Sequence, residues 1–160
     1  VEALAALGSG VGQVLRSSLE ILSPPARAAV LGVLARVGDS AVLPALLDAI
    51  QEDDDEVRAT AIDALGQLGD LRAVGPLIDL LQSDDDGVSG AAVAALSFLA
   101  SRSGGRQAVV RACRDKVHAA CGPLIRLLGQ VGDAEDILTM RTALKGPDPE
   151  GRRAAADALG

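Results

Sequence analysis

Residues 56–70 read EVRATAIDALGQLGD, and residues 25–39, which lie 31 positions earlier, read PARAAVLGVLARVGD. The motif LGQVGD at 128–133 repeats the end of the first block, at 65–70, two periods later, and EGRRAAADALG at 150–160 repeats its start three periods later. A fixed period of about 31 residues predicts stacked structural repeats. Such an array presents a long ridged surface and not the closed pocket of most enzymes.

Each copy of the repeat combines two helical patterns with a polar turn. In the clearest copy, Val57, Ala61, Leu65 and Leu68 form an apolar stripe at helical spacing, and no alternating strand pattern occurs in the chain. The sequence therefore predicts an all-α fold, an α-solenoid (superhelix) of about five helical-hairpin repeats with partial repeats at both ends. The expected helices lie near 2–7, 11–22, 25–37, 40–51, 55–68, 71–82, 88–100, 105–114, 117–131, 134–145 and 149–160.

Two features qualify this regular array. Pro44 and Pro76 fall inside the expected first helices of two repeats, where a missing backbone donor predicts a kink. Between 101 and 132 the usual Gly-Asp turn is replaced by SRSGGR, which marks an irregular repeat.

We expect residues 1–160 to form one domain, and the pattern is cut off at both ends, as in a piece of a longer protein. The cut ends of such an array expose apolar faces, so end-to-end self-association is possible.

The composition argues against several classes of function. A net charge of −7 and a pI near 4.6 disfavour nucleic-acid binding, which requires positive charge. No apolar run is long enough to cross a bilayer, so no membrane partner is expected. Two cysteines do not form a disulfide framework, which favours a reducing, cytoplasmic location.

The stretch Asp54–Leu81 carries the pattern D-x-x-V-R-x-x-A-x-x-A-L-G-x-L-G-D-x-R-A-V-x-P-L-I-x-L-L. This pattern resembles the HEAT-like repeats of phycobilin-lyase-related and many other bacterial proteins. The resemblance implies a fold and is nearly silent on activity. It also implies a polar ladder between neighbouring repeats, in which an early arginine of the second helix meets an aspartate of the turn. The matching positions are Arg27, Arg58 and Arg152 for the arginines and Asp54 and Asp85 for the aspartates, with Asp53, Asp84 and Asp148 as further candidates; Ser89 interrupts the series.

In this type of repeat the second helices line the concave surface. Thr60, Asp63 and Gln67 share one face of the helix over 55–68, away from the apolar stripe. Shifting this face by the period gives the predicted partner-binding residues Phe98, Asp63, Gln67, Arg126, Gln130 and Arg36. Phe98 is the only aromatic residue of the chain, and two alternatives stay open for it: an exposed anchor for a partner, or a core residue buried by a local rotation of the helix.

Charge is unevenly distributed along the chain. Residues 39–86 hold thirteen acidic and two basic residues, whereas Arg102, Arg106, Arg111 and Arg114 form a basic stretch in the irregular repeat. The stretch is a secondary candidate for binding a partner of opposite charge. The alternative is an ordinary solvated helix face.

Other constellations favour packing over chemistry. The acidic turns at 52–56 and 84–86 are candidates for Ca²⁺ binding, but their spacing favours helix capping. Cys113, His118 and Cys121 are too few and too widely spaced for a zinc site or an assembled nucleophile, so buried cysteine is the simpler interpretation. The glycines at 8, 10 and 12 lack the preceding strand that a dinucleotide site needs. No catalytic residue, metal or cofactor is predicted.

These observations favour a non-catalytic module that scaffolds or binds a protein or peptide partner on its concave helical surface. A subunit of a phycobilin-lyase-like enzyme and a purely structural spacer are the alternatives. A HEAT-like DNA glycosylase is disfavoured, because the concave residues are nearly neutral and a base-flipping enzyme needs basic and aromatic groups.

Overall fold

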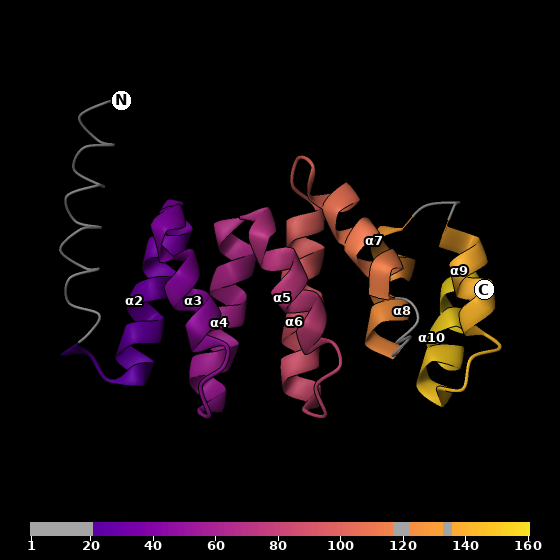
Figure 1. The fold of residues 1–160 in the computed structure, drawn as a ribbon, viewed down its shortest axis with the longest axis horizontal. Coiled ribbons are helices and arrows are strands. Elements are labelled where there is room, and N and C mark those ends of the chain that lie inside the picture. Colours follow the sequence, from indigo (N-terminus) through magenta and orange to yellow (C-terminus); the bar gives the residue numbers. More distant parts are fainter. Residues whose placement is uncertain (1–20, 117–121, 133–135) are drawn as a thin grey trace. The chain divides into compact units, whose positions relative to one another are not determined.

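The computed structural model describes residues 21–116, 122–132 and 136–160. Every regular element in these ranges is helical, as Figure 1 shows, and the predicted all-α solenoid class is confirmed. The chain divides into two compact units at the turn between Asp70 and Leu71. That all repeats form a single domain stays a prediction, and the predicted helices over 2–7 and 11–22 fall almost wholly outside the described residues.

The first unit contains α2 (Pro24–Val37), the 3-10 helix η2 (Ser40–Val42), α3 (Leu43–Ala49) and α4 (Asp55–Leu68). Helix α4 packs against both α2 and α3. Gly38 and Gly69, which follow α2 and α4, adopt left-handed φ angles of 83° and 75°. This conformation ends a helix at little cost only in glycine, and it explains why the Gly-Asp pair at 38–39 recurs at 69–70, one period later.

The second unit contains the 3-10 helix η3 (Leu71–Ala73), α5 (Val74–Leu80), α6 (Asp86–Ala100), α7 (Gly105–Lys116), α8 (Gly122–Val131), α9 (Ile137–Ala143) and α10 (Pro149–Leu159). The second helices of the repeats form one layer, since α8 packs between α6 and α10. The first helices α5 and α7 pack against each other and against α6. Figure 1 shows the hairpin partners of this unit side by side.

The predicted second helices agree closely with the structure. The first helices α3, α5 and α9 are shorter than predicted, and α7 is two residues longer. Instead of one helix over 71–82, a 3-10 turn precedes α5, and a 3-10 turn likewise precedes α3. A bend of the helix axis at these prolines stays a prediction. Pro44 and Pro76 lie in the first turn of an α-helix and not, as predicted, in its interior. The reason is that backbone N–H groups in the first turn have no intrahelical acceptor, and proline there sacrifices no hydrogen bond.

The cores of the two units consist of aliphatic side chains from the predicted stripes. Val57, Ala61, Leu65 and Leu68 of α4 are all buried. In the second unit, Ile125 of α8 lies in a cluster with Ala143, Ala154 and Ala155. Small side chains on facing helices allow close packing, and they leave the polar faces of the same helices available for other contacts.

The aspartates of the acidic turns act as helix caps. Asp54 accepts hydrogen bonds from the N–H groups of Glu56 and Val57, and Asp85 accepts from Gly87 and Val88, over 2.8 to 3.2 Å. Asp148 repeats the arrangement at α10, where it accepts from the N–H groups of Glu150 and Gly151. Each carboxylate satisfies donors that the first helical turn leaves without an acceptor.

Candidate functional site

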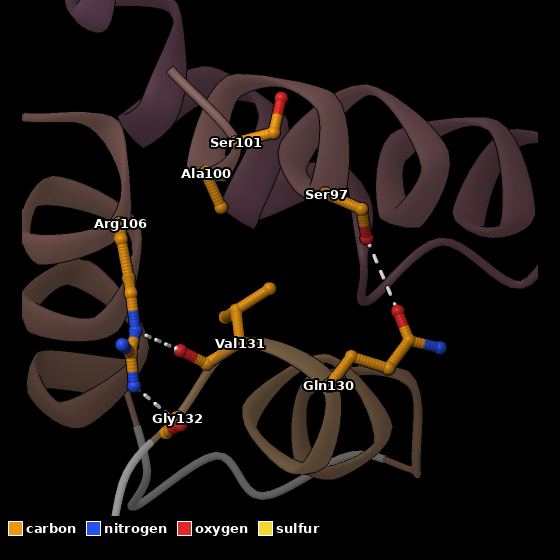
Figure 2. A pocket seen from close by; sticks show the side chains of 7 residues that line it. All are labelled: Ser97, Ala100, Ser101, Arg106, Gln130, Val131 and Gly132. Atoms are coloured by element: carbon orange, nitrogen blue, oxygen red, sulfur yellow. Dashed lines mark hydrogen bonds between the residues drawn. The ribbon is translucent and has the colours of Figure 1, made fainter. Parts of the chain in front are cut away.

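A groove opens where the C-terminal end of α6, the start of α7 and the C-terminal end of α8 meet (Figure 2). We call it the α6–α8 groove; its volume is about 530 Å³. Its walls are polar side chains and helix ends, and the lining residues are Ser97, Ala100, Ser101, Arg106, Gln130, Val131 and Gly132. All of them belong to the second unit.

The irregular turn between α6 and α7 forms one wall of the groove. Gly104 has a left-handed φ of 76°, and the buried Gly105 begins α7 directly against the end of α6. A Cβ atom at position 105 would overlap the carbonyl oxygen of Leu99. The SRSGGR sequence thus turns the chain in a space that only glycine fits, and this turn brings Arg106 to the groove.

Arg106 fixes the start of α7 to the end of α8. Its Nε donates to the carbonyl oxygen of Val131 and its Nη2 to that of Gly132, both over 2.8 Å (Figure 2). The last carbonyls of a helix lack intrahelical donors and carry the negative end of the helix dipole, so a guanidinium is a favourable partner. Across the groove, the Ser97 hydroxyl donates to Oε1 of Gln130 over 3.1 Å and links α6 to α8.

Phe98 follows Ser97 on α6 and is 47% exposed. Phe98 is therefore not a buried core residue, and its role as an anchor for a partner stays a prediction. The guanidinium of Arg102, one turn further along, lies 5.3 Å from the centre of the phenyl ring. This separation is within the range of a cation–π interaction. Ala94, one turn earlier, is also exposed and leaves space beside the ring.

The other predicted partner-binding residues are divided between the two units. Arg36, Asp63 and Gln67 belong to the first unit, where the Gln67 amide donates to the Asp63 carboxylate. Arg126 belongs to the second unit and forms an ion pair of 3.1 Å with Glu150, beside a second cavity between the N-terminal halves of α6, α8 and α10. Of the predicted set, the structure therefore brings only Gln130 into the α6–α8 groove, with Phe98 adjacent in sequence to the lining residue Ser97.

The basic stretch is only partly available for binding. Arg114 forms an ion pair of 2.6 Å with Asp136, whose side chain is completely buried at the start of α9, and Arg106 bonds to the end of α8. Arg102 and Arg111 are exposed. Asp136 was not predicted as a site residue. The signal that could have indicated it is its place just before an apolar helix, 22 residues after Arg114.

The arginines at the positions of the expected polar ladder contact carboxylates and carbonyl groups of nearby turns. Arg27 forms an ion pair with Glu52 over 3.8 Å, and Arg58 with Asp55. Arg152 donates to the carbonyl oxygens of Gly146 and Pro147. The pairing of these arginines with the capping aspartates of neighbouring repeats stays a prediction.

The candidates for metal or cysteine chemistry gain no support. Within residues 21–116, 122–132 and 136–160, no three His, Cys, Asp or Glu side chains are grouped to hold a metal ion. Cys113 is buried in α7, and His118, Cys121 and the glycines at 8, 10 and 12 lie outside the described residues. In the part of the chain that the structure describes, no helix is both long enough and apolar enough to span a membrane.

A family model for HEAT repeats matches residues 12–97, a little over half of the chain. The chain belongs to the HEAT-repeat family. The predicted resemblance is thereby confirmed, and the second helices α2 and α4 lie within the matched range, which ends inside α6. The α6–α8 groove extends beyond that range into the irregular repeat, where the sequence departs from the family pattern.

Among solved structures, this HEAT-repeat chain is similar to the complex of CpcE and CpcF of phycocyanin lyase from Nostoc sp. PCC7120. The two chains are 26% identical and align with a TM-score of 0.50. The alignment covers 83% of this chain and 57% of the lyase chain, so this HEAT-repeat chain spans little more than half of that relative. No curated protein matches the sequence.

Proposed function

We propose that this HEAT-repeat chain is a non-catalytic scaffolding module that binds a protein or peptide partner on the concave surface of its second helices. The observation that carries the proposal is the exposed Phe98, which lies beside Arg102 on α6 and follows the groove residue Ser97 in the sequence. An exposed aromatic ring with small neighbours is typical of an anchor at the centre of an interface. The solved relative is itself part of a two-protein complex, which supports a protein as the partner.

The polar contacts of the α6–α8 groove support binding over catalysis. Arg106 and Ser97 are engaged by α8, so they stiffen the walls of the groove without forming a nucleophile–base pair. A preformed surface reduces the entropy lost on binding. The proposal includes a bacterial, cytoplasmic location, which the two cysteines and the resemblance to a Nostoc protein support. The net charge of −7 argues against a nucleic acid as the partner.

Replacing Phe98 by alanine is expected to weaken partner binding about 30-fold, as for a typical anchor residue. The measurement is a pull-down with the wild-type chain and the Phe98→Ala variant, in which the retained proteins are quantified by mass spectrometry. Ile137→Ala is the matched control, because Ile137 is 44% exposed and lies on α9, outside the groove. A protein retained by the wild type and by the control, and lost by Phe98→Ala, is the expected result. Equal retention by all three chains would refute the role of Phe98.

A subunit of a phycobilin-lyase-like enzyme is the second candidate, and the similarity to the Nostoc lyase favours it. A bilin needs aromatic and basic groups that converge on one groove, and this chain has one Phe, no Trp and no Tyr. We therefore expect that titrating a free bilin with the chain leaves the visible absorption spectrum of the bilin unchanged. A saturable spectral shift, abolished in the Phe98→Ala variant, would favour the lyase-like role instead.

A further inference from the structure

The surface around the α6–α8 groove has the opposite charge to the chain as a whole. The chain carries a net charge of −7, yet residues 87–114 contain four arginines and no acidic residue or lysine. Helix α8 forms the opposite wall, and its residues in the groove, Gln130 and Val131, are uncharged. None of the described residues that line the groove is a carboxylate. A ligand on this surface therefore meets an excess of positive charge, whereas the excess of acidic residues lies in residues 39–86.

Two of the arginines are available to a ligand. Arg102 and Arg111 are exposed, and neither forms an ion pair with any residue of the described ranges. Arg106 lies between them and lines both the groove and a smaller cavity of about 190 Å³ along α7, together with Gln107, Val110, Arg111 and Arg114. Arg106 and Arg111 thus extend the positive charge from the groove along α7, as far as the last turn, where Arg114 is paired with Asp136 and Asp115 is exposed.

An apolar contact lies at the start of this row of charges. The phenyl ring of Phe98 is exposed under the guanidinium of Arg102, so an apolar side chain and a carboxylate of one ligand could be bound next to each other. Two other groove groups are suited to a peptide backbone: the NH₂ group of Gln130 can donate, and the hydroxyl oxygen of Ser101, whose hydrogen is donated to the carbonyl of Phe98, can accept.

We propose that the α6–α8 groove, with Arg102 and Arg111, binds an acidic peptide segment of a separate protein partner, with an apolar side chain of that segment on Phe98. This inference rests on the proposed function and names the chemistry of its partner. Charge complementarity between the segment and the arginines sets its specificity and its rate of association. A nucleic acid is disfavoured, because its dense negative charge would also meet the acidic remainder of the chain.

The test measures binding of a short fluorescein-labelled peptide, in which Glu and Leu alternate, by fluorescence anisotropy. The same peptide with Gln in place of Glu is the uncharged control. We expect the acidic peptide to bind the wild-type chain more tightly, and the double variant R102Q/R111Q to bind it about tenfold more weakly. The matched variant Arg153→Gln removes an exposed arginine of α10 and should leave binding unchanged. Raising the ionic strength should weaken wild-type binding more than binding by the double variant.

Several results would overturn the inference. One is equal affinity for the acidic and uncharged peptides, and another is an equal loss in Arg153→Gln and the double variant. A third is a wild-type chain that does not bind the peptide but sediments as a salt-sensitive dimer, which the double variant does not form. This result would identify a second copy of the chain as the occupant of the groove. The proposed function can be tested separately from this inference. If a cellular partner is lost with Phe98→Ala but is retained by the double variant at all salt concentrations, the proposed function stands and the acidic segment is refuted.

Discussion

A Gly105→Ala variant is expected to lose about 3 kcal/mol of unfolding free energy, which places it among the most harmful single changes in the chain. The added Cβ would overlap the carbonyl oxygen of Leu99 and lie 2.8 Å from its carbonyl carbon. Both are backbone atoms of α6, so no side-chain rotation relieves the clash. The start of α7 has to move away from α6, and the contact of Arg106 with the end of α8 is lost with it.

Denaturant unfolding followed by far-UV circular dichroism measures this loss, because the chain has no Trp or Tyr to serve as a fluorescent probe. Gly90→Ala is the matched control. Gly90 lies in α6, where an added Cβ would have no atom within 4 Å, and alanine there should raise the stability by up to about 1 kcal/mol. If the two variants proved equally stable, the close approach of α7 to Leu99 would be incorrect.

An Arg114→Ala variant is expected to lose about 3 kcal/mol, because it removes the guanidinium from a completely buried carboxylate. Asp136 lies at the start of α9 and Arg114 near the end of α7, so the ion pair joins two consecutive repeats. We therefore expect the Arg114→Ala variant to lose protection from hydrogen exchange in α9, in addition to its lower overall stability.

The matched control is Arg111→Ala on the same helix, where the side chain is exposed and the expected change is below about 0.5 kcal/mol. A double variant with Arg114→Met and Asp136→Leu should recover much of the loss, since an apolar pair of similar volume needs no charge compensation. An Arg114→Ala chain as stable as Arg111→Ala would show that the buried carboxylate does not depend on this arginine.

The helices of the repeat were predictable because their boundaries are encoded locally. An aspartate that caps the first turn and a glycine after the last turn gave the predicted limits of α4, which the structure reproduces. The short 3-10 turns before α3 and α5 were not predicted, because the apolar spacing of a 3-10 turn followed by a helix is close to that of one longer helix. Pro44 and Pro76 were the signal in the sequence that distinguishes a 3-10 turn followed by a short helix from one longer helix.

The groove was less predictable than the helices. Shifting the exposed face by one and by two periods led to Phe98 and to the groove residue Gln130, because both lie on second helices that follow the pattern. The partners of Arg106 and Arg114 could not be obtained this way. They lie 22 to 26 residues further along the chain, which does not correspond to the period, and they depend on how the glycine turn orients α7. Only three-dimensional packing determines such contacts.

The capping aspartates recur at nearly the same sequence spacing on both sides of the irregular repeat. Asp54 and Asp85 cap α4 and α6 one period apart, and Asp148 caps α10 two full periods further on. The spacing between caps is thus preserved across the altered turn to within one residue, since Asp148 follows Asp85 by 63 residues and Asp85 follows Asp54 by 31. The irregular repeat differs from its neighbours by substitution, with a net change in length of at most one residue, so its distinct side chains occupy fixed positions of a common framework. Exchanging this one repeat for a regular copy of equal length should therefore leave the position of α10 and its cap in the repeat pattern unchanged.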